Sequence, residues 1–308
     1  MKPELFIVGA PKCGTTALCE YLRTHPSVFI SRPKEPFFFC DDLPGLPGVK
    51  SADEYDALFR NVPPGTRIAG EGSATYLCSD VALDRIRAFS PDARIIAMLR
   101  NPIELAPSFH SQLLYNRTED QESFDRAWAL QDERAEGRSI PELCREPAIL
   151  QYRKVARLGE QVERLFSIFP REQTLLVFFE DFRRSPREVY LRVLEFLDIP
   201  DAGRTDFPRV NENKRHRVGV LARFTQRPPR IFSAAASAAR RFLGRDDLVF
   251  LGPLRRANAS VRERTPLSIQ MRQQLVDEFA GDVERLARLT GRDLDHWLAP
   301  PAEKDEPA

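Results

Sequence analysis

An apolar run that ends in a glycine-rich segment is the feature that most constrains the fold of this chain. Residues 6–8 are apolar, Gly9 ends the run, and Gly14 and two threonines then open a helical pattern. This order predicts a buried strand, a tight loop and a helix start. Glycines let backbone N–H groups face one anion, and the first N–H groups of a helix add to such a site. The stretch is either a phosphate-binding loop or an ordinary strand-to-helix turn.

The position of the lysine distinguishes this loop from the common P-loop. In GxxxxGK[ST] the lysine directly follows the second glycine. Here Thr15 follows Gly14, and Lys12 precedes that glycine by two residues. Lys12 still supplies a full positive charge, and Thr15 and Thr16 can donate hydroxyls where the helix begins. We interpret the segment as a phosphate loop with its lysine moved.

Strand patterns alternate with helical patterns along most of the chain. We predict strands within residues 6–8, 28–30, 66–77, 93–102 and 174–181, and helices over 15–25, 53–60, 82–91, 104–115, 149–168, 185–199 and 268–290. Such alternation predicts an α/β fold, a three-layer sandwich with a central parallel sheet. Ligands bind such sheets at the carboxyl ends of the strands, where we place Gly9, Glu71, Arg100 and Glu180.

Composition and cysteine usage narrow the class of protein. The chain has 308 residues, 42% of them hydrophobic and 30% charged, which is typical of a globular protein. A net charge of +1 gives no reason to expect a nucleic-acid partner. Five irregularly spaced cysteines without a CxxC pair argue against a disulfide framework or zinc site, so we expect a reducing, cytoplasmic location and no metal. No apolar run approaches the roughly 18 residues of a membrane span, and the early first strand leaves no room for a signal peptide.

A second anion site is predicted after the strand within residues 93–102. Arg100 ends that strand, and Ser108 lies one to two turns into the next helix. Arginine binds phosphate through two parallel hydrogen bonds, and a serine hydroxyl can add a third. Arg100 could equally form a surface salt bridge. Together with the glycine loop, the pair suggests a nucleotide with two separated phosphates.

Lys34 and Glu35 precede three phenylalanines in "RPKEPFFF". An apolar wall beside a carboxylate raises its pKa and can suit it to act as a general base. The same pattern also fits a surface Lys–Glu pair followed by a core segment.

Taken together, these motifs resemble the sulfotransferase superfamily that uses 3'-phosphoadenylyl sulfate (PAPS), and most closely its heparan sulfate branch with its bacterial relatives. "FIVGAPKCGTTAL" resembles the family's 5'-phosphosulfate loop, "SRPKEPFFF" its catalytic glutamate segment, and "LRNPIELAPSFHSQL" its 3'-phosphate motif. "EGSATYL", "VFFEDF" and "VERLARLTGRDLDHW" also look like family features. The resemblance reaches about residue 298.

The resemblance implies sulfuryl transfer from PAPS to a hydroxyl of a carbohydrate or small-molecule natural product, without a metal. Glu35 would be the base, and Lys12 would stabilise the leaving nucleotide. The residues implied to hold the donor are Lys12, Cys13, Gly14, Thr15, Thr16, Arg100 and Ser108, with Lys214 and Arg217 as further candidates in the later basic stretch "NENKRHR".

The chain also departs from the family pattern. Many glycan-modifying relatives have lysine and proline where this chain has Gly72 and Ala74, which puts a heparan-type acceptor in doubt. His110 lies two residues beyond Ser108 and is the second candidate for the base. Sugars, lipids, phenols and natural products all remain open as acceptors, and the oligomeric state is equally open.

Three other functions are compatible with parts of the pattern. "TLLVFFED" looks like a Walker-B strand, so a P-loop kinase or NTPase using ATP and magnesium is one alternative. Cys13 in a phosphate-type loop suggests a cysteine phosphatase, although the arginine expected six residues later is Cys19. A non-catalytic binding module is the third.

We expect one domain over residues 1–298, with residues 220–260 as a variable lid or acceptor region. The Pro-rich, charged tail 299–308 is predicted to be disordered. Within the variable region, "RIFSAAASAARRFLGR" fits a surface helix or lid better than a membrane anchor.

Overall fold

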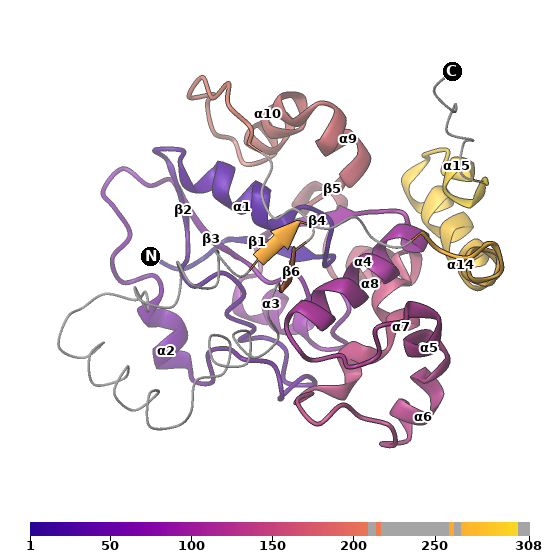
Figure 1. Ribbon diagram of the computed structural model, residues 1–308. Helices are drawn as coiled ribbons and strands as arrows, with labels where there is room; N and C mark the ends of the chain where they lie inside the picture. Colours follow the sequence, from indigo (N-terminus) through magenta and orange to yellow (C-terminus); the bar gives the residue numbers. More distant parts are fainter. Residues whose placement is uncertain (209–213, 217–258, 262–265, 301–308) are drawn as a thin grey trace.

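Five parallel strands form the centre of the molecule (Figure 1). The computed structural model describes residues 1–208, 214–216, 259–261 and 266–300. The strands pair in the order β2-β3-β1-β4-β5, and each neighbouring pair is parallel. Their bounds are β1 (Leu5–Gly9), β2 (Val28–Ile30), β3 (Ile68–Gly72), β4 (Arg94–Leu99) and β5 (Thr174–Phe178). The predicted parallel α/β sheet is confirmed.

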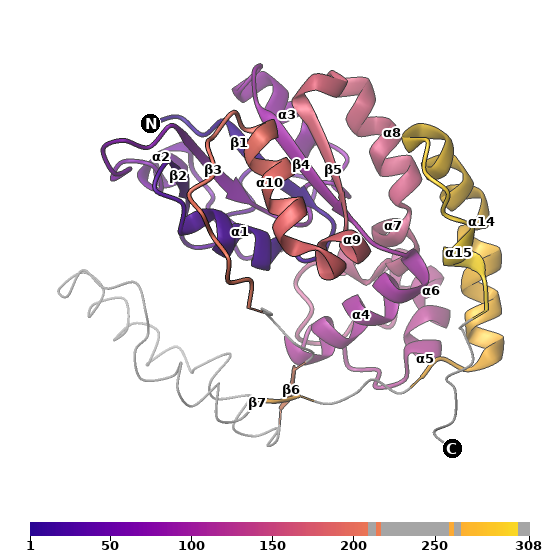
Figure 2. The same cartoon turned by 90° about the horizontal axis from the view of Figure 1, so that it is seen from above.

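Helices cover both faces of this sheet (Figure 2). One face carries α1 (Thr15–Arg23) and α10 (Pro186–Phe196), and the other carries α3 (Ala82–Phe89) and α8 (Leu158–Ile168). Every residue of β1 is therefore buried, which explains why its sequence is a continuous apolar run rather than an alternating one.

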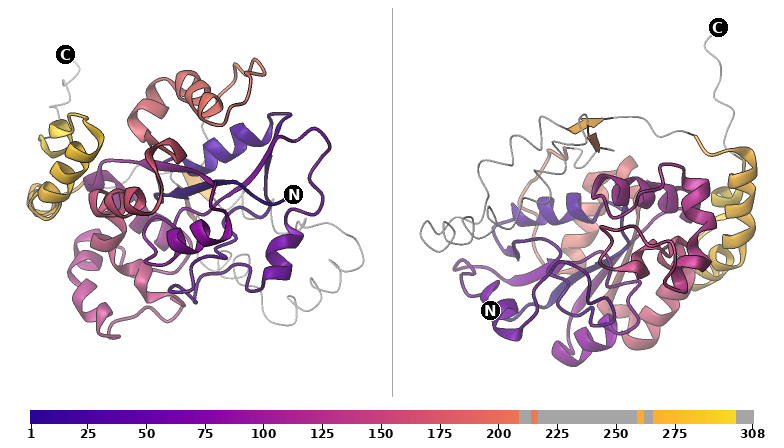
Figure 3. Two further views of the ribbon diagram at one scale, coloured as in Figure 1. Left: turned by 180° about the vertical axis from the view of Figure 1, so that it is seen from behind. Right: turned by 60° about the horizontal axis from the view of Figure 1, so that its bottom comes forward.

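The remaining elements surround the sheet. The long helix α14 (Ile269–Thr290) runs along the outer side of α8 (Figures 2 and 3). A short antiparallel pair, β6 (Lys214–His216) and β7 (Ala259–Val261), lies beside α4 (Pro102–Tyr115). The others are α2 (Ala52–Ala57), α5 (Phe124–Ala129), α6 (Gln131–Ala135), η1 (Pro147–Leu150), α7 (Tyr152–Ala156), η2 (Arg171–Gln173), α9 (Phe179–Arg184) and α15 (Asp295–Leu298).

The single helix predicted over residues 149–168 is wrong. This stretch contains the end of η1, then α7 and α8, because Gln151 and Arg157 leave helical geometry with ψ near 77° and 74°. The backbone N–H groups in the first turn of α8 need hydrogen-bond acceptors. The carboxylate of Asp282 in α14 accepts hydrogen bonds from two of them, at 2.8 and 2.9 Å. The short helices α5 and α6 were not predicted at all.

The expected placement of Glu180 at a strand end also needs correction. β5 ends at Phe178, and Glu180 lies in the first turn of α9. There its carboxylate pairs with Arg292 and accepts a hydrogen bond from Trp297 Nε1 at 3.2 Å. Glu180 therefore connects the sheet to the C-terminal helices.

Parts of two predictions lie outside the described residues: the variable region apart from residues 259–260, and the tail beyond residue 300. Within the described part of the chain, no helix is long and apolar enough to cross a membrane.

Candidate active site

The loop after β1 is built around two glycines in crowded or left-handed positions. A side chain on Gly9 would stand 2.6 Å from Leu77 Cβ, so the loop can pass close to the segment after β3 only with glycine there. Gly14 precedes α1 with φ of 91° and gives the helix no side-chain cap. The N-terminal end of α1 therefore keeps its backbone donors and positive dipole end for an anion.

Lys12 and Arg100 connect this loop to the segment after β4. Lys12 Nζ donates to Gln112 Oε1 at 3.1 Å, and Arg100 donates from Nη1 to the carbonyl oxygen of Lys12 at 3.2 Å. Arg100 also pairs with Glu104 at 2.8 Å and lies over the ring of Phe179 at 4.8 Å. The two predicted anion-binding segments are thus in direct contact.

One face of helix α4 lies at the contact between the loop after β1 and the segment after β4. Ser108 is buried in this helix and lies four residues before Gln112, so both side chains belong to one face. Gln112 was not among the predicted residues. Its spacing from Ser108 is the only sequence signal for it, because its partner Lys12 is 100 residues away.

Cys13 is fully buried within this loop. Burial raises the pKa of its thiol to about 12, although the charges of Arg100 and Lys12 act in the opposite direction. A nucleophilic cysteine needs a depressed pKa. The burial of Cys13 therefore argues against the cysteine phosphatase alternative.

Glu35 lies at the carboxyl end of β3, although it belongs to the segment after β2. Its backbone N–H donates to the carbonyl oxygen of Gly72 at 3.0 Å, and its own φ is 65°. The carboxylate is 38% exposed and pairs with Lys34 Nζ at 2.5 Å. Two of the three phenylalanines expected to form an apolar wall pack in the core: Phe38 stacks on Tyr55, and Phe39 packs against Phe6.

Glu71, which the sequence placed at the ligand-binding edge without a role, is a fully buried carboxylate near the end of β3. Burial raises its pKa to about 7, against the effect of hydrogen bonds from Ser73 (2.7 Å), Tyr76 (2.7 Å) and Tyr55 (3.1 Å). The charge of Lys34 also favours the ionised form.

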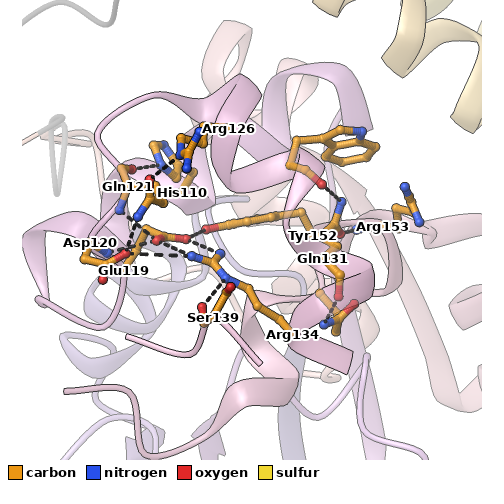
Figure 4. Close-up of polar contacts among 12 residues, drawn as sticks. His110, Glu119, Asp120, Gln121, Arg126, Gln131, Arg134, Ser139, Tyr152 and Arg153 are labelled. Carbon is orange, nitrogen blue, oxygen red and sulfur yellow. Dashed lines mark hydrogen bonds and ion pairs between the residues drawn. The ribbon is translucent and has the colours of Figure 1, made fainter. Parts of the chain in front are cut away.

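His110 belongs to a polar cluster on another side of α4 (Figure 4). It is buried, with Nε2 at 2.8 Å from the Gln121 carbonyl oxygen and its ring against Phe124 and Tyr152. Two residues along a helix correspond to about 200°, so His110 and Ser108 face different ways.

The remaining predicted residues are placed only in part. Thr15 is buried and Thr16 half-buried in the first turn of α1, directly after Gly14. The backbone of Lys214 lies in β6, which contacts α4, while Arg217 is outside the described residues. Within the described residues, no group of three or more His, Cys, Asp or Glu side chains is placed to hold a metal ion.

Comparison with known proteins shows the family to which the chain belongs. The model of the sulfotransferase domain family matches residues 2–213, more than half of the chain. The chain belongs to the sulfotransferase family. The resemblance to the sulfotransferase superfamily is thereby confirmed, and the kinase or NTPase alternative is not favoured.

Several characterised sulfotransferases are similar to this one. The mouse protein "Heparan sulfate glucosamine 3-O-sulfotransferase 6" is 38% identical over 117 residues, 36% of this chain and 31% of its own length. Human "Carbohydrate sulfotransferase 15" is 26% identical over 249 residues, 64% of this chain and 44% of its own. This sulfotransferase therefore matches less than half the length of these curated relatives.

A solved sulfotransferase from Alicyclobacillus acidocaldarius resembles the whole fold. Its TM-score is 0.71 at 27% identity, with 97% of this chain and 100% of that chain covered. The parallel sheet and its flanking helices are thus an arrangement already known in a bacterial sulfotransferase.

Proposed function

We propose that this sulfotransferase moves a sulfuryl group from PAPS to a hydroxyl group of a carbohydrate or a small-molecule natural product. The observation that carries the proposal is the contact between the two anion-binding segments. Arg100 bonds the backbone of Lys12, and Lys12 bonds Gln112 on the Ser108 face of α4. A nucleotide with phosphates at two positions needs donors from two segments, and this contact supports a single site made from both.

The residues present fit such a donor. The uncapped N-terminus of α1 and the ammonium of Lys12 suit the 5'-phosphosulfate. Arg100 and Ser108 suit the 3'-phosphate, and Arg100 would exchange its pairing with Glu104 for the phosphate. Cys13 would contribute through its backbone, since its thiol is buried and protonated.

The chemistry assigns separate roles to Glu35 and Lys12. The Glu35 carboxylate accepts the proton of the acceptor hydroxyl as that oxygen attacks sulfur in line with the leaving group. Lys12 stabilises the negative charge that develops on the bridging oxygen of the leaving nucleotide. A positioned base of this kind typically contributes about 10²–10⁴-fold in rate.

A transfer assay with sulfur-labelled PAPS tests the proposal. The wild-type protein is incubated without added metal against a panel of sugars, phenols and hydroxylated natural products, and label in the acceptor is counted. We expect transfer to at least one acceptor class, and a Lys12→Ala variant with kcat at least about tenfold lower. An unchanged kcat in this variant would exclude the leaving-group role of Lys12.

A further inference from the structure

Lys34 is a largely buried cation at the carboxyl edge of the sheet. Its side chain is 15% exposed, and Nζ lies 2.5 Å from Glu35 Oε1. Its Cε lies 3.8 Å from where a side chain on Gly72 would begin, and Glu71 directly precedes that glycine. The ion pair with Glu35 therefore offsets part of the cost of burying the charge of Lys34, and that charge also acts on the buried carboxylate of Glu71.

The position of Gly72 places Lys34 near α1, the helix that follows the phosphate loop. Gly72 pairs in register with Ile7 of β1, two residues before Gly9, and its carbonyl holds Glu35 by a hydrogen bond of 3.0 Å. A side chain at Gly72 would stand 2.6 Å from Cys19 Sγ of α1. The absence of a side chain at Gly72 therefore lets Cys19 of α1 and the side chain of Lys34 both approach this end of β3.

The backbone at Glu35 supports a functional role for the pair. Its φ of 65° is in the left-handed region, which a residue with a long side chain rarely adopts. Backbone strain of this kind persists where the surroundings impose it, and it gathers at functional sites. The strained residue turns a 38% exposed carboxylate outward while Lys34 stays inside.

The ammonium of Lys34 has more N–H donors than the hydrogen bonds found for it within the described residues. An ammonium carries three N–H donors, and within the described part of the chain one hydrogen bond to Nζ is found, from Nζ to Glu35. Two further donors can therefore face an anion at this edge.

We propose that Lys34 is a second catalytic cation, whose ammonium donates to the sulfonate oxygens of PAPS during transfer while its neighbour Glu35 acts as base. The proposal rests on the proposed function. In the step, the acceptor oxygen–sulfur bond forms and the bond from sulfur to the bridging phosphate oxygen breaks. The electron pair stays on that phosphate oxygen, the hydroxyl proton passes to Glu35, and Lys34 keeps its protons.

Binding of two nucleotides separates this role from a structural one. PAPS carries the sulfonate, and its product 3',5'-bisphosphoadenosine does not. Calorimetry on Lys34→Met should show PAPS affinity lowered about tenfold, with affinity for the bisphosphate changed less than about twofold. On any acceptor that the panel identifies, the kcat of Lys34→Met should be at least about tenfold below that of the wild-type protein. Lys34→Arg should recover part of this loss.

Lys154→Met is the matched control. Lys154 also pairs with a carboxylate at 2.5 Å, that of Asp80, but both side chains are at least half exposed. The Lys154→Met variant also removes one positive charge, but it should leave the affinities for PAPS and for 3',5'-bisphosphoadenosine unchanged.

Two results would overturn the role of Lys34 alone. Either PAPS and bisphosphate affinities fall together in Lys34→Met, which indicates a structural contribution, or neither falls. If the wild-type protein binds neither nucleotide, the proposed function fails and the Lys34 role fails with it.

Discussion

Glu35 and His110 stand in contrasting surroundings, and the contrast favours Glu35 as the base. The Glu35 carboxylate is 38% exposed, and its backbone is bonded to the end of β3, the strand next to β1. His110 is 3% exposed, its Nε2 is engaged with the Gln121 carbonyl, and Phe124 and Tyr152 pack on its ring. A base must reach a substrate proton, and the more accessible group is better placed to do so.

Glu35→Gln should keep the affinity for 3',5'-bisphosphoadenosine and lose turnover. The amide retains the size of the carboxylate but accepts no proton at neutral pH. Affinity is measured by calorimetry and turnover with labelled PAPS. If Glu35→Gln turns over normally and His110→Ala abolishes activity, His110 is the base instead.

Because of Glu71, the free energy of unfolding should fall as the pH rises. Its pKa is about 7 in the folded protein against an ordinary 4.5. The folded state therefore holds its proton more tightly, and the stabilisation present below pH 4.5 is lost as the pH rises through 7. We expect a loss of about 3 kcal/mol from this group, absent in Glu71→Gln. Chemical denaturation across this range measures it; parallel curves for the two proteins would refute the assignment.

At the scale of elements, a buried ion pair holds the segments between α4 and α7 together (Figure 4). Arg134 of α6 donates to both oxygens of Glu119, at 2.6 and 2.7 Å, and Tyr152 of α7 adds a third hydrogen bond at 2.6 Å. Both members of the pair have fully buried side chains. Burial alone would oppose ionisation of Glu119, but hydrogen bonds from Arg134 and Tyr152 outweigh it and lower the pKa to about 2.

Glu119→Gln should destabilise the fold by about 3–5 kcal/mol, because it leaves the Arg134 charge buried without its partner. The depressed pKa means that this stabilisation is complete above pH 4.5 and is lost as the pH falls towards 2. The control is Glu136→Gln, whose exposed pair with Arg138 is worth at most about 1 kcal/mol. Equal losses in the two variants, measured by denaturant unfolding, would contradict this role.

Elements and site residues were predictable where the signal is local in sequence. The strand, loop and helix around Gly14 follow from a single short stretch, and Arg100 follows from its place after an apolar run. The breaks that make α7 and α8 were not predictable, because Asp282, which caps α8, is more than 120 residues away. The contact of Gln112 with Lys12 and the position of Lys34 beside Gly72 also depend on residues far apart in the sequence.

At the scale of the whole molecule, the described unit extends beyond the family match that ends at residue 213. Asn101, which caps α4, donates to the carbonyl oxygen of Trp297 at 3.0 Å, and Glu180 lies beside His296 and the indole of Trp297. The C-terminal helices thus support the segment that carries Arg100 and Ser108. These contacts favour our proposal of one domain reaching residue 298.

Binding of 3',5'-bisphosphoadenosine, measured by calorimetry without metal and beside ATP and GTP with magnesium, tests the central claim most directly. We predict tight, metal-free binding of the bisphosphate and weak binding of the two triphosphates, because our proposal assigns separate groups to its two phosphates. Binding of ATP alone, and only with magnesium, would contradict the assignment of both phosphate sites.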